Sequence, residues 1–111
     1  MTPWDRTSIQ LLLSTIKQEI QQLYRDRLDS IYLSGSYARG KATEQSDVDL
    51  LVVLNDNAIF TFTEIGAMGE ITYQVSLTYD KLVTVVPVTK QRFDRLASPL
   101  YKTVKQEGRL L

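Results

Sequence analysis

Apolar residues recur near the start of the chain with the period of an α-helix. Between Thr7 and Tyr24 most spacings between apolar positions are three or four residues, and these positions are Ile9, Leu12, Leu13, Ile16, Ile20 and Leu23. Residues at these spacings form one stripe on a helix surface, which can pack against a core. The pattern therefore predicts an amphipathic helix over residues 7–24.

Three short segments have the composition of β-strands. They cover residues 30–34, 47–54 and 82–86 and are rich in β-branched, leucine or aromatic side chains. The first segment runs into Gly35, which indicates a tight turn, and a polar connection over residues 37–46 leads to the second. Pro87 follows the third segment and cannot donate a ladder hydrogen bond, so it indicates an edge strand or the end of a strand.

Two further segments predict helices. Thr61-Phe-Thr-Glu64 matches a capping box, in which the threonine and glutamate side chains each accept from a free backbone N–H at a helix start. Ser98 followed by Pro99 predicts the start of a last helix over residues 99–107, and Gly108 is expected to end it in the left-handed conformation. One face of the first of these helices is expected to consist of Ile65, Met68, Thr72, Val75 and Tyr79.

The order of these elements predicts the fold class. A helix, two strands, a helix, a strand and closing helices indicate an α/β or α+β protein with a small sheet covered by helices. The chain of 111 residues has the usual size of one domain. We therefore expect residues 1–111 to form a single domain.

Composition restricts the chemistry that is open to the chain. It contains neither cysteine nor histidine, so catalysis has to rest on carboxylates, hydroxyls and hard metal ions. Thirteen basic residues balance thirteen acidic ones, which disfavours binding of long nucleic acids. The apolar runs are far shorter than the roughly 20 residues that cross a bilayer, and we expect an intracellular, cytoplasmic protein.

A candidate phosphate site follows the first strand. Gly35 has no side chain and allows a ligand to approach closely, and Ser36 offers a hydroxyl and a backbone N–H. A short helix opening at Ser36 would direct free N–H groups towards an anion, and Arg39 and Lys41 could add positive charge. The same residues are also typical of an ordinary turn, so this motif alone leaves both interpretations open.

A candidate metal site opens the second strand. Asp47 and Asp49 are two residues apart, and because strand side chains alternate, both carboxylates project from one face. Two such carboxylates repel unless a cation holds them, and oxygen ligands suit Mg²⁺. Leu51 and Val53 share this face, which places the pair at the rim of a core. A solvated strand end would give the same pattern, but the ten residues between Ser36 and Asp47 could bring phosphate and metal sites together.

Two motifs resemble the minimal nucleotidyltransferases of the polymerase-β-like superfamily. They are Leu33-Ser-Gly-Ser-Tyr-Ala-Arg-Gly40 and Ser46-Asp-Val-Asp-Leu-Leu-Val-Val53. The resemblance extends over nearly the whole chain. It implies a small mixed sheet flanked by helices, with Gly35 and Ser36 on the nucleotide phosphates and two Mg²⁺ ions between Asp47 and Asp49.

The resemblance also implies a third catalytic carboxylate on the next strand, which would help to hold metal and to activate the acceptor. Asp80 is the candidate, with a helix-capping role as its alternative, and Thr84 is a weaker alternate. Arg39 lies just past the Gly-Ser turn in the family motif and is the candidate for a phosphate contact, although a structural arginine would fit equally.

Three functions of different classes are compatible with the sequence. Minimal members of this family resemble antitoxins paired with a helical HEPN-domain ribonuclease toxin, which implies transfer of AMP from ATP to a hydroxyl of that partner within a hetero-oligomer. A binding module that neutralises the partner with an idle site is the second hypothesis. Nucleotide transfer to a small molecule such as an aminoglycoside is the third, but no acidic run indicates a site for a cationic substrate.

Overall fold

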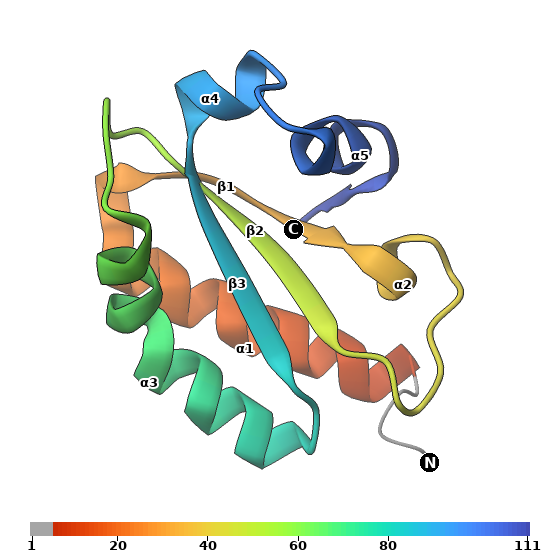
Figure 1. The fold of residues 1–111 in the computed structure, drawn as a ribbon. Coiled ribbons are helices and arrows are strands. Elements are labelled where there is room, and N and C mark those ends of the chain that lie inside the picture. The colour runs from red at the N-terminus through yellow and green to blue at the C-terminus, as the bar shows by residue number, and fades with distance from the viewer. Residues whose placement is uncertain (1–5) are drawn as a thin grey trace.

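The computed structural model describes residues 6–111 as a small sheet with helices on both faces (Figure 1). A short 3₁₀ turn, Arg25–Arg27, leads from the first helix into the first strand. In chain order the other elements are α1 (Arg6–Tyr24), β1 (Leu28–Ser34), α2 (Gly35–Ala38), β2 (Val48–Leu54), α3 (Thr61–Tyr79), β3 (Val83–Thr89), α4 (Lys90–Asp94), α5 (Pro99–Glu107) and β4 (Arg109–Leu110).

The sheet is mixed and has the strand order β3-β2-β1-β4. Strand β1 runs antiparallel to β2 and to β4, whereas β2 and β3 are parallel because α3 forms a crossover between them. The register places Asp49 beside Ser34 on one side and beside Thr84 on the other. The start of β2 therefore lies next to the end of β1 and the start of β3.

The two faces of the sheet carry separate hydrophobic clusters. Helices α1 and α3 cover one face, and α4 and α5 lie over the other (Figure 1). The larger cluster joins α1 and α3 to the sheet through residues such as Ile16, Met68 and Val52, all fully buried. The smaller cluster beneath α4 and α5 consists of Leu51, Val53, Val88, Phe93 and Val104, with Tyr32 and Tyr101 packed against it.

The structure confirms the predicted fold class and most of the predicted elements. Helix α5 has the predicted bounds, and the Ser98 hydroxyl caps it by accepting from the Tyr101 N–H at 3.3 Å. Pro87 lies inside β3 rather than at its end, and β3 is an edge strand, as one of the two interpretations required. The two-residue strand β4 was not predicted, because so short a segment has no period of its own.

The predicted capping box of α3 is wrong, although the helix does begin at Thr61. Its N-cap is Phe60, and no side chain caps the first turn. Glu64 instead points into the core, where it accepts from the Tyr24 hydroxyl at 3.1 Å and from the Arg27 guanidinium at 3.1 Å. Met68 and Val75 of the predicted packed face are buried as expected, whereas Ile65 is 36% exposed.

The predicted left-handed conformation of Gly108 is also wrong. Its backbone is extended, with φ −66° and ψ 154°. Glycine is needed here because no side chain fits: a Cβ at this position would lie 2.5 Å from the carbonyl oxygen of Val104 and 3.3 Å from that of Leu33. Gly108 thus lets the chain pass from α5 directly into β4 against β1.

No helix within residues 6–111 is long and apolar enough to cross a membrane.

Candidate active site

The two candidate metal ligands lie where β2 begins, and Asp49 is on the face that α5 covers. Asp47 is the exposed residue before the strand, and Asp49 is its second residue and half-buried. Further along the same face, Leu51 and Val53 are buried in the smaller hydrophobic cluster. The Asp49 carboxylate therefore stands at the rim of a core, whereas Asp47 precedes the strand and its place on the same face stays a prediction.

Gly35 makes room for the Asp49 carboxylate. Its φ is +70°, a conformation that side chains disfavour, and an added Cβ would lie 2.6 Å from Asp49 Oδ2. The preceding residue, Ser34, donates from its hydroxyl to the Asp49 carbonyl oxygen at 3.3 Å. The Gly-Ser turn and the Asp-x-Asp strand are thus packed directly against each other.

Of the other two predicted phosphate-binding residues, one lies within α2 and one directly after it. Ser36 is the second residue of this one-turn helix and is half-buried. Arg39 follows the helix, and its Nη1 lies 3.9 Å from Glu107 Oε2 at the end of α5. Both side chains of this pair are largely exposed, so the contact is weak and leaves the guanidinium able to reorient towards an anion.

A pocket of about 240 Å³ opens between the Asp49 end of the sheet and α5. It brings together Arg39, Asp49 and Thr84, and its one basic side chain is that of Arg39. Asp47, Ser36 and Asp80 do not line it. The full lining consists of Ser34, Gly35, Arg39, Asp49, Leu50, Leu51, Thr84, Val86, Leu100, Thr103 and Val104.

The structure does not bring Asp80 to the aspartate pair. Asp80 is the exposed residue that ends α3, in a left-handed conformation with φ 53° and ψ 46°. Within residues 6–111 no three acidic residues gather in a way that could hold a metal ion. The residue that β3 does place beside Asp49 is Thr84, whose hydroxyl donates to Asp49 Oδ1 at 2.7 Å. Within residues 6–111 Asp80 thus does not join Asp47 and Asp49 in a cluster, and its role as a third catalytic carboxylate stays a prediction.

A buried lysine that the sequence did not single out holds the connection before Asp47. Lys81 is 5% exposed, and its Nζ donates to the Glu44 carbonyl oxygen at 2.6 Å. The ammonium group also lies 6.0 Å from the centre of the Tyr37 ring. Since Val48 N–H donates to the Leu82 carbonyl at 2.9 Å, the α3–β3 turn fixes the start of β2 at two points.

The donor set at this rim fits a magnesium ion. No lysine or arginine of the described chain forms an ion pair with Asp47 or Asp49. Both carboxylates are therefore free to meet a cation, and Mg²⁺ commonly takes one or two protein carboxylates and completes its shell with water and phosphate oxygens. Two aspartates are enough for this mode of binding.

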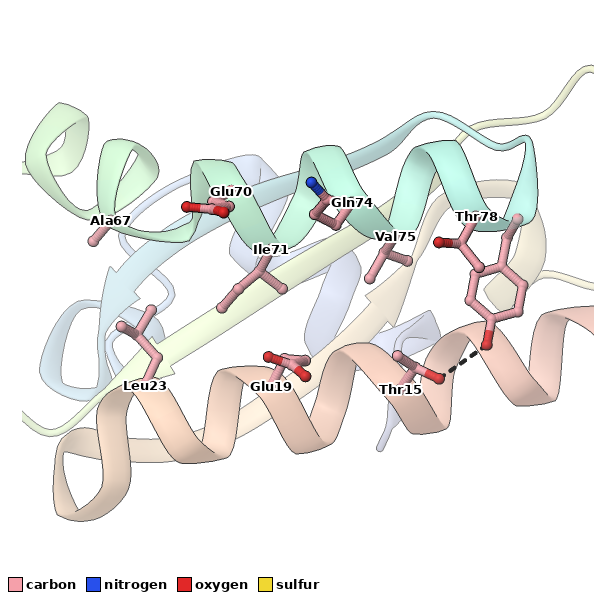
Figure 2. Close-up of a pocket in the computed structure, with 10 residues that line it drawn as sticks. Thr15, Glu19, Leu23, Ala67, Glu70, Ile71, Gln74, Val75 and Thr78 are labelled. Carbon is pink, nitrogen blue, oxygen red and sulfur yellow. Dashed lines mark hydrogen bonds between the residues drawn. The ribbon is translucent and has the colours of Figure 1, made fainter.

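A second groove, of about 470 Å³, lies on the opposite face of the sheet between α1 and α3 (Figure 2). Thr15 and Tyr79 are hydrogen-bonded across it at 3.0 Å. Glu19 of α1 and Glu70 of α3 line it, and no lysine or arginine does. This charge disfavours a nucleotide, so the pocket at Asp49 remains the candidate active site.

Comparisons with known proteins identify the family of the chain. A model of the nucleotidyltransferase domain matches residues 13–111. The chain is 35% identical over 75 residues to a Methanocaldococcus jannaschii protein named "Putative protein adenylyltransferase". The aligned region covers 68% of this chain and 74% of that protein.

Two solved structures of toxin–antitoxin complexes contain a similar chain. One complex, with AMP-PNP, gives a TM-score of 0.55 at 28% identity and covers 85% of this chain and 70% of that one. A variant of the complex MntA-HpeT gives a TM-score of 0.53 at 29% identity, and the match covers 86% of this chain and 70% of that one. With a family match over residues 13–111, which includes both motifs of the site, the chain belongs to the nucleotidyltransferase domain family.

Proposed function

We propose that this protein transfers AMP from ATP to a hydroxyl of a partner protein, using Asp47 and Asp49 as ligands for Mg²⁺. The observation that carries the proposal is Asp49, which lines the pocket and packs against the Gly35 turn, with Asp47 two residues before it. Neither aspartate has a basic partner in the described chain. The name of the archaeal relative, a protein adenylyltransferase, supports the choice of AMP and of a protein acceptor.

The proposed reaction forms one bond to the α-phosphorus and breaks one. The acceptor oxygen attacks the α-phosphorus of ATP, the bond from that phosphorus to the bridging oxygen breaks, pyrophosphate leaves, and the hydroxyl proton passes to a base or to water. Mg²⁺ held at the rim supplies neutralisation of the phosphate charge. Gly35 admits the phosphates close to the backbone, and Arg39 turns from Glu107 to a phosphate oxygen.

We further propose that the acceptor belongs to a helical toxin of the HEPN type and that the chain acts as its antitoxin in a cytoplasmic hetero-oligomer. The two similar chains in toxin–antitoxin complexes support this assignment, and one of those complexes holds AMP-PNP. An attached AMP adds negative charge and bulk, which at a nuclease site would repel an RNA substrate.

A binding module without catalysis is the second candidate. The pocket offers Arg39 alone as a basic residue for the phosphates of a nucleotide, and this weak positive charge is the observation that favours an idle site. In that case the chain would neutralise its partner by contact, and the aspartates could be replaced without effect.

Intact-mass measurement of the partner tests the proposal. The protein and the product of its neighbouring gene are incubated with Mg²⁺ and ATP, and we expect the partner to gain the mass of one or more AMP units. Asp47→Asn/Asp49→Asn should abolish the gain. Asp80→Asn is the matched control, because asparagine tolerates the left-handed conformation of this residue.

The wild type and the two variants separate the hypotheses. Retained transfer in Asp80→Asn with loss in the double variant supports a site with two carboxylates. Loss of transfer in Asp80→Asn would instead identify Asp80 as the third catalytic carboxylate. A stable complex without any adduct, from any of the four nucleotides, would overturn the transferase and favour the binding module.

A further inference from the structure

We propose that Thr84 is the positioning residue of the site: its hydroxyl holds the Asp49 carboxylate in the orientation that binds metal. This inference rests on the proposed function and names a residue that acts through Asp49. Thr84 does not itself contact the nucleotide or the acceptor in this proposal.

The first argument is the geometry of the pair. Asp49 and Thr84 are directly opposite each other in the parallel ladder of β2 and β3, so both side chains project from the same face. The Thr84 Oγ1 to Asp49 Oδ1 distance is 2.7 Å, which is the short range of hydroxyl–carboxylate hydrogen bonds. Bonds of this kind to an ionised oxygen are roughly twice as strong as neutral ones.

The second argument is that the rest of Asp49 is confined as well. Its Oδ2 faces the bare Cα of Gly35, where a Cβ would approach to 2.6 Å. Its carbonyl oxygen accepts from Ser34. The Asp49 carboxylate is therefore held at Oδ1 by Thr84 and has Oδ2 close to Gly35. Asp47, by contrast, is exposed and has no side-chain hydrogen bond within residues 6–111.

The third argument is the chemistry of a threonine at this place. The hydroxyl is neutral, so it adds no ligand charge beyond that of the two aspartates. It is one proton donor aimed at one carboxylate oxygen, which leaves Oδ2 and the remaining lone pair of Oδ1 for a cation. Partners of this kind, which orient a metal ligand, typically change metal affinity or activity by about 10- to 100-fold when they are removed.

Metal binding provides the test. Calorimetric titration with Mn²⁺ in the presence of α,β-methylene-ATP, whose α–β bond cannot be cleaved, measures affinity without turnover, and transfer to the partner is measured in parallel. Thr84→Val removes the hydroxyl and keeps the shape. We expect Mn²⁺ affinity and kcat to fall by about 10-fold or more, and Thr84→Ser to restore both.

A control and a reference variant make the outcomes distinguishable. Thr72→Val removes a comparable hydroxyl, which donates to the Gly69 carbonyl at 3.0 Å on the far helix α3, and should change neither quantity. Asp49→Asn should abolish Mn²⁺ binding. Wild-type affinity in Thr84→Val, or no rescue in Thr84→Ser, would overturn the role of Thr84 while leaving the proposed function intact. No Mn²⁺ binding by the wild type would instead overturn the proposed function.

Discussion

Two glycines have nearly the same backbone conformation, but only one of them contacts the site. Gly35 and Gly40 have φ values of +70° and +69°, but a Cβ would meet Asp49 Oδ2 only at Gly35, whereas nothing lies within 4 Å of the Cβ position at Gly40. A left-handed conformation costs roughly 1–2 kcal/mol in a residue with a side chain. The pair therefore separates backbone strain from displacement of a catalytic group.

We predict that Gly35→Ala and Gly40→Ala each lower the free energy of unfolding by about 1 kcal/mol, and that only Gly35→Ala abolishes AMP transfer. The added methyl group of Gly35→Ala pushes the Asp49 carboxylate away from its position. Urea unfolding and the intact-mass assay measure the two effects. Equal activities of the two variants would show that contact with Asp49 is irrelevant.

At the scale of elements, the end of α5 carries a second crowded glycine. Leu100, Thr103 and Val104 of α5 line the pocket, and Gly108 joins this helix to β4. Gly66 offers a contrast, because it lies exposed inside α3 with nothing within 4 Å of its Cβ position. Replacement of glycine by alanine should therefore change the free energy of unfolding in opposite directions in the two elements.

Gly108→Ala is predicted to lower the free energy of unfolding by about 1–3 kcal/mol, because its methyl group would overlap the Val104 carbonyl. Gly66→Ala should raise it by about 0.5–1 kcal/mol, because alanine loses less backbone freedom in a helix. Denaturant unfolding measures both. A stabilised Gly108→Ala protein would mean that α5 can move away from β1 at no cost.

At the scale of the whole molecule, one polar cluster joins α1, the 3₁₀ turn and α3 at the end of the sheet remote from the pocket. Glu64 binds the Tyr24 hydroxyl and the Arg27 guanidinium, and Arg27 also pairs with Asp56 at 3.0 Å. Burial, followed by the hydrogen bond to Glu64, raises the pKa of Tyr24 well above its ordinary value. The carboxylates of Asp56 and Glu64 raise the pKa of Arg27 in turn.

This cluster predicts a loss of stability at high pH. Below about pH 10, the usual pKa of tyrosine, both the folded and the unfolded chain keep the phenol proton. Above it the unfolded chain releases the proton while folded Tyr24 retains it, so unfolding becomes more favourable as the pH rises. The stabilising contribution of Tyr24 is therefore complete at neutral pH and is lost in alkaline solution.

Unfolding of Tyr24→Phe at a series of pH values measures this contribution. At pH 7 the variant should be less stable than the wild type by about 1.5–3 kcal/mol, the usual range for a hydrogen bond to a charged group. The difference should shrink above pH 10. Tyr73→Phe is the control, because Tyr73 is 61% exposed and should show no difference at either pH. A difference between wild type and Tyr24→Phe that does not vary with pH would contradict the prediction.

Much of the fold could be predicted because its signals are local. The stripe of α1 and the bounds of α5 each arise within one element, from side-chain spacing and from capping residues. Strand β2 was also found from its own composition, although both of its faces are buried. The proximity of the Gly-Ser turn to the Asp-x-Asp strand also followed from the sequence, since adjacent strands joined by a short connection commonly pair.

The errors share a physical cause, which is that the deciding contact is distant in the chain. Glu64 has the spacing of a capping box, but Tyr24 and Arg27 provide better partners than the helix N-terminus does. Gly108 has the place of a left-handed cap, but the nearby Val104 and Leu33 carbonyls require glycine for space alone. No local pattern contains either contact.

The sequence by itself determined the class of fold, the turn at Gly35 and the two aspartates, because backbone freedom and alternation are properties of neighbouring residues. The tertiary structure decided which residue stands beside Asp49. The parallel register of β2 and β3 places Thr84 there and leaves Asp80 at the end of α3, a choice that depends on the length and packing of the crossover helix.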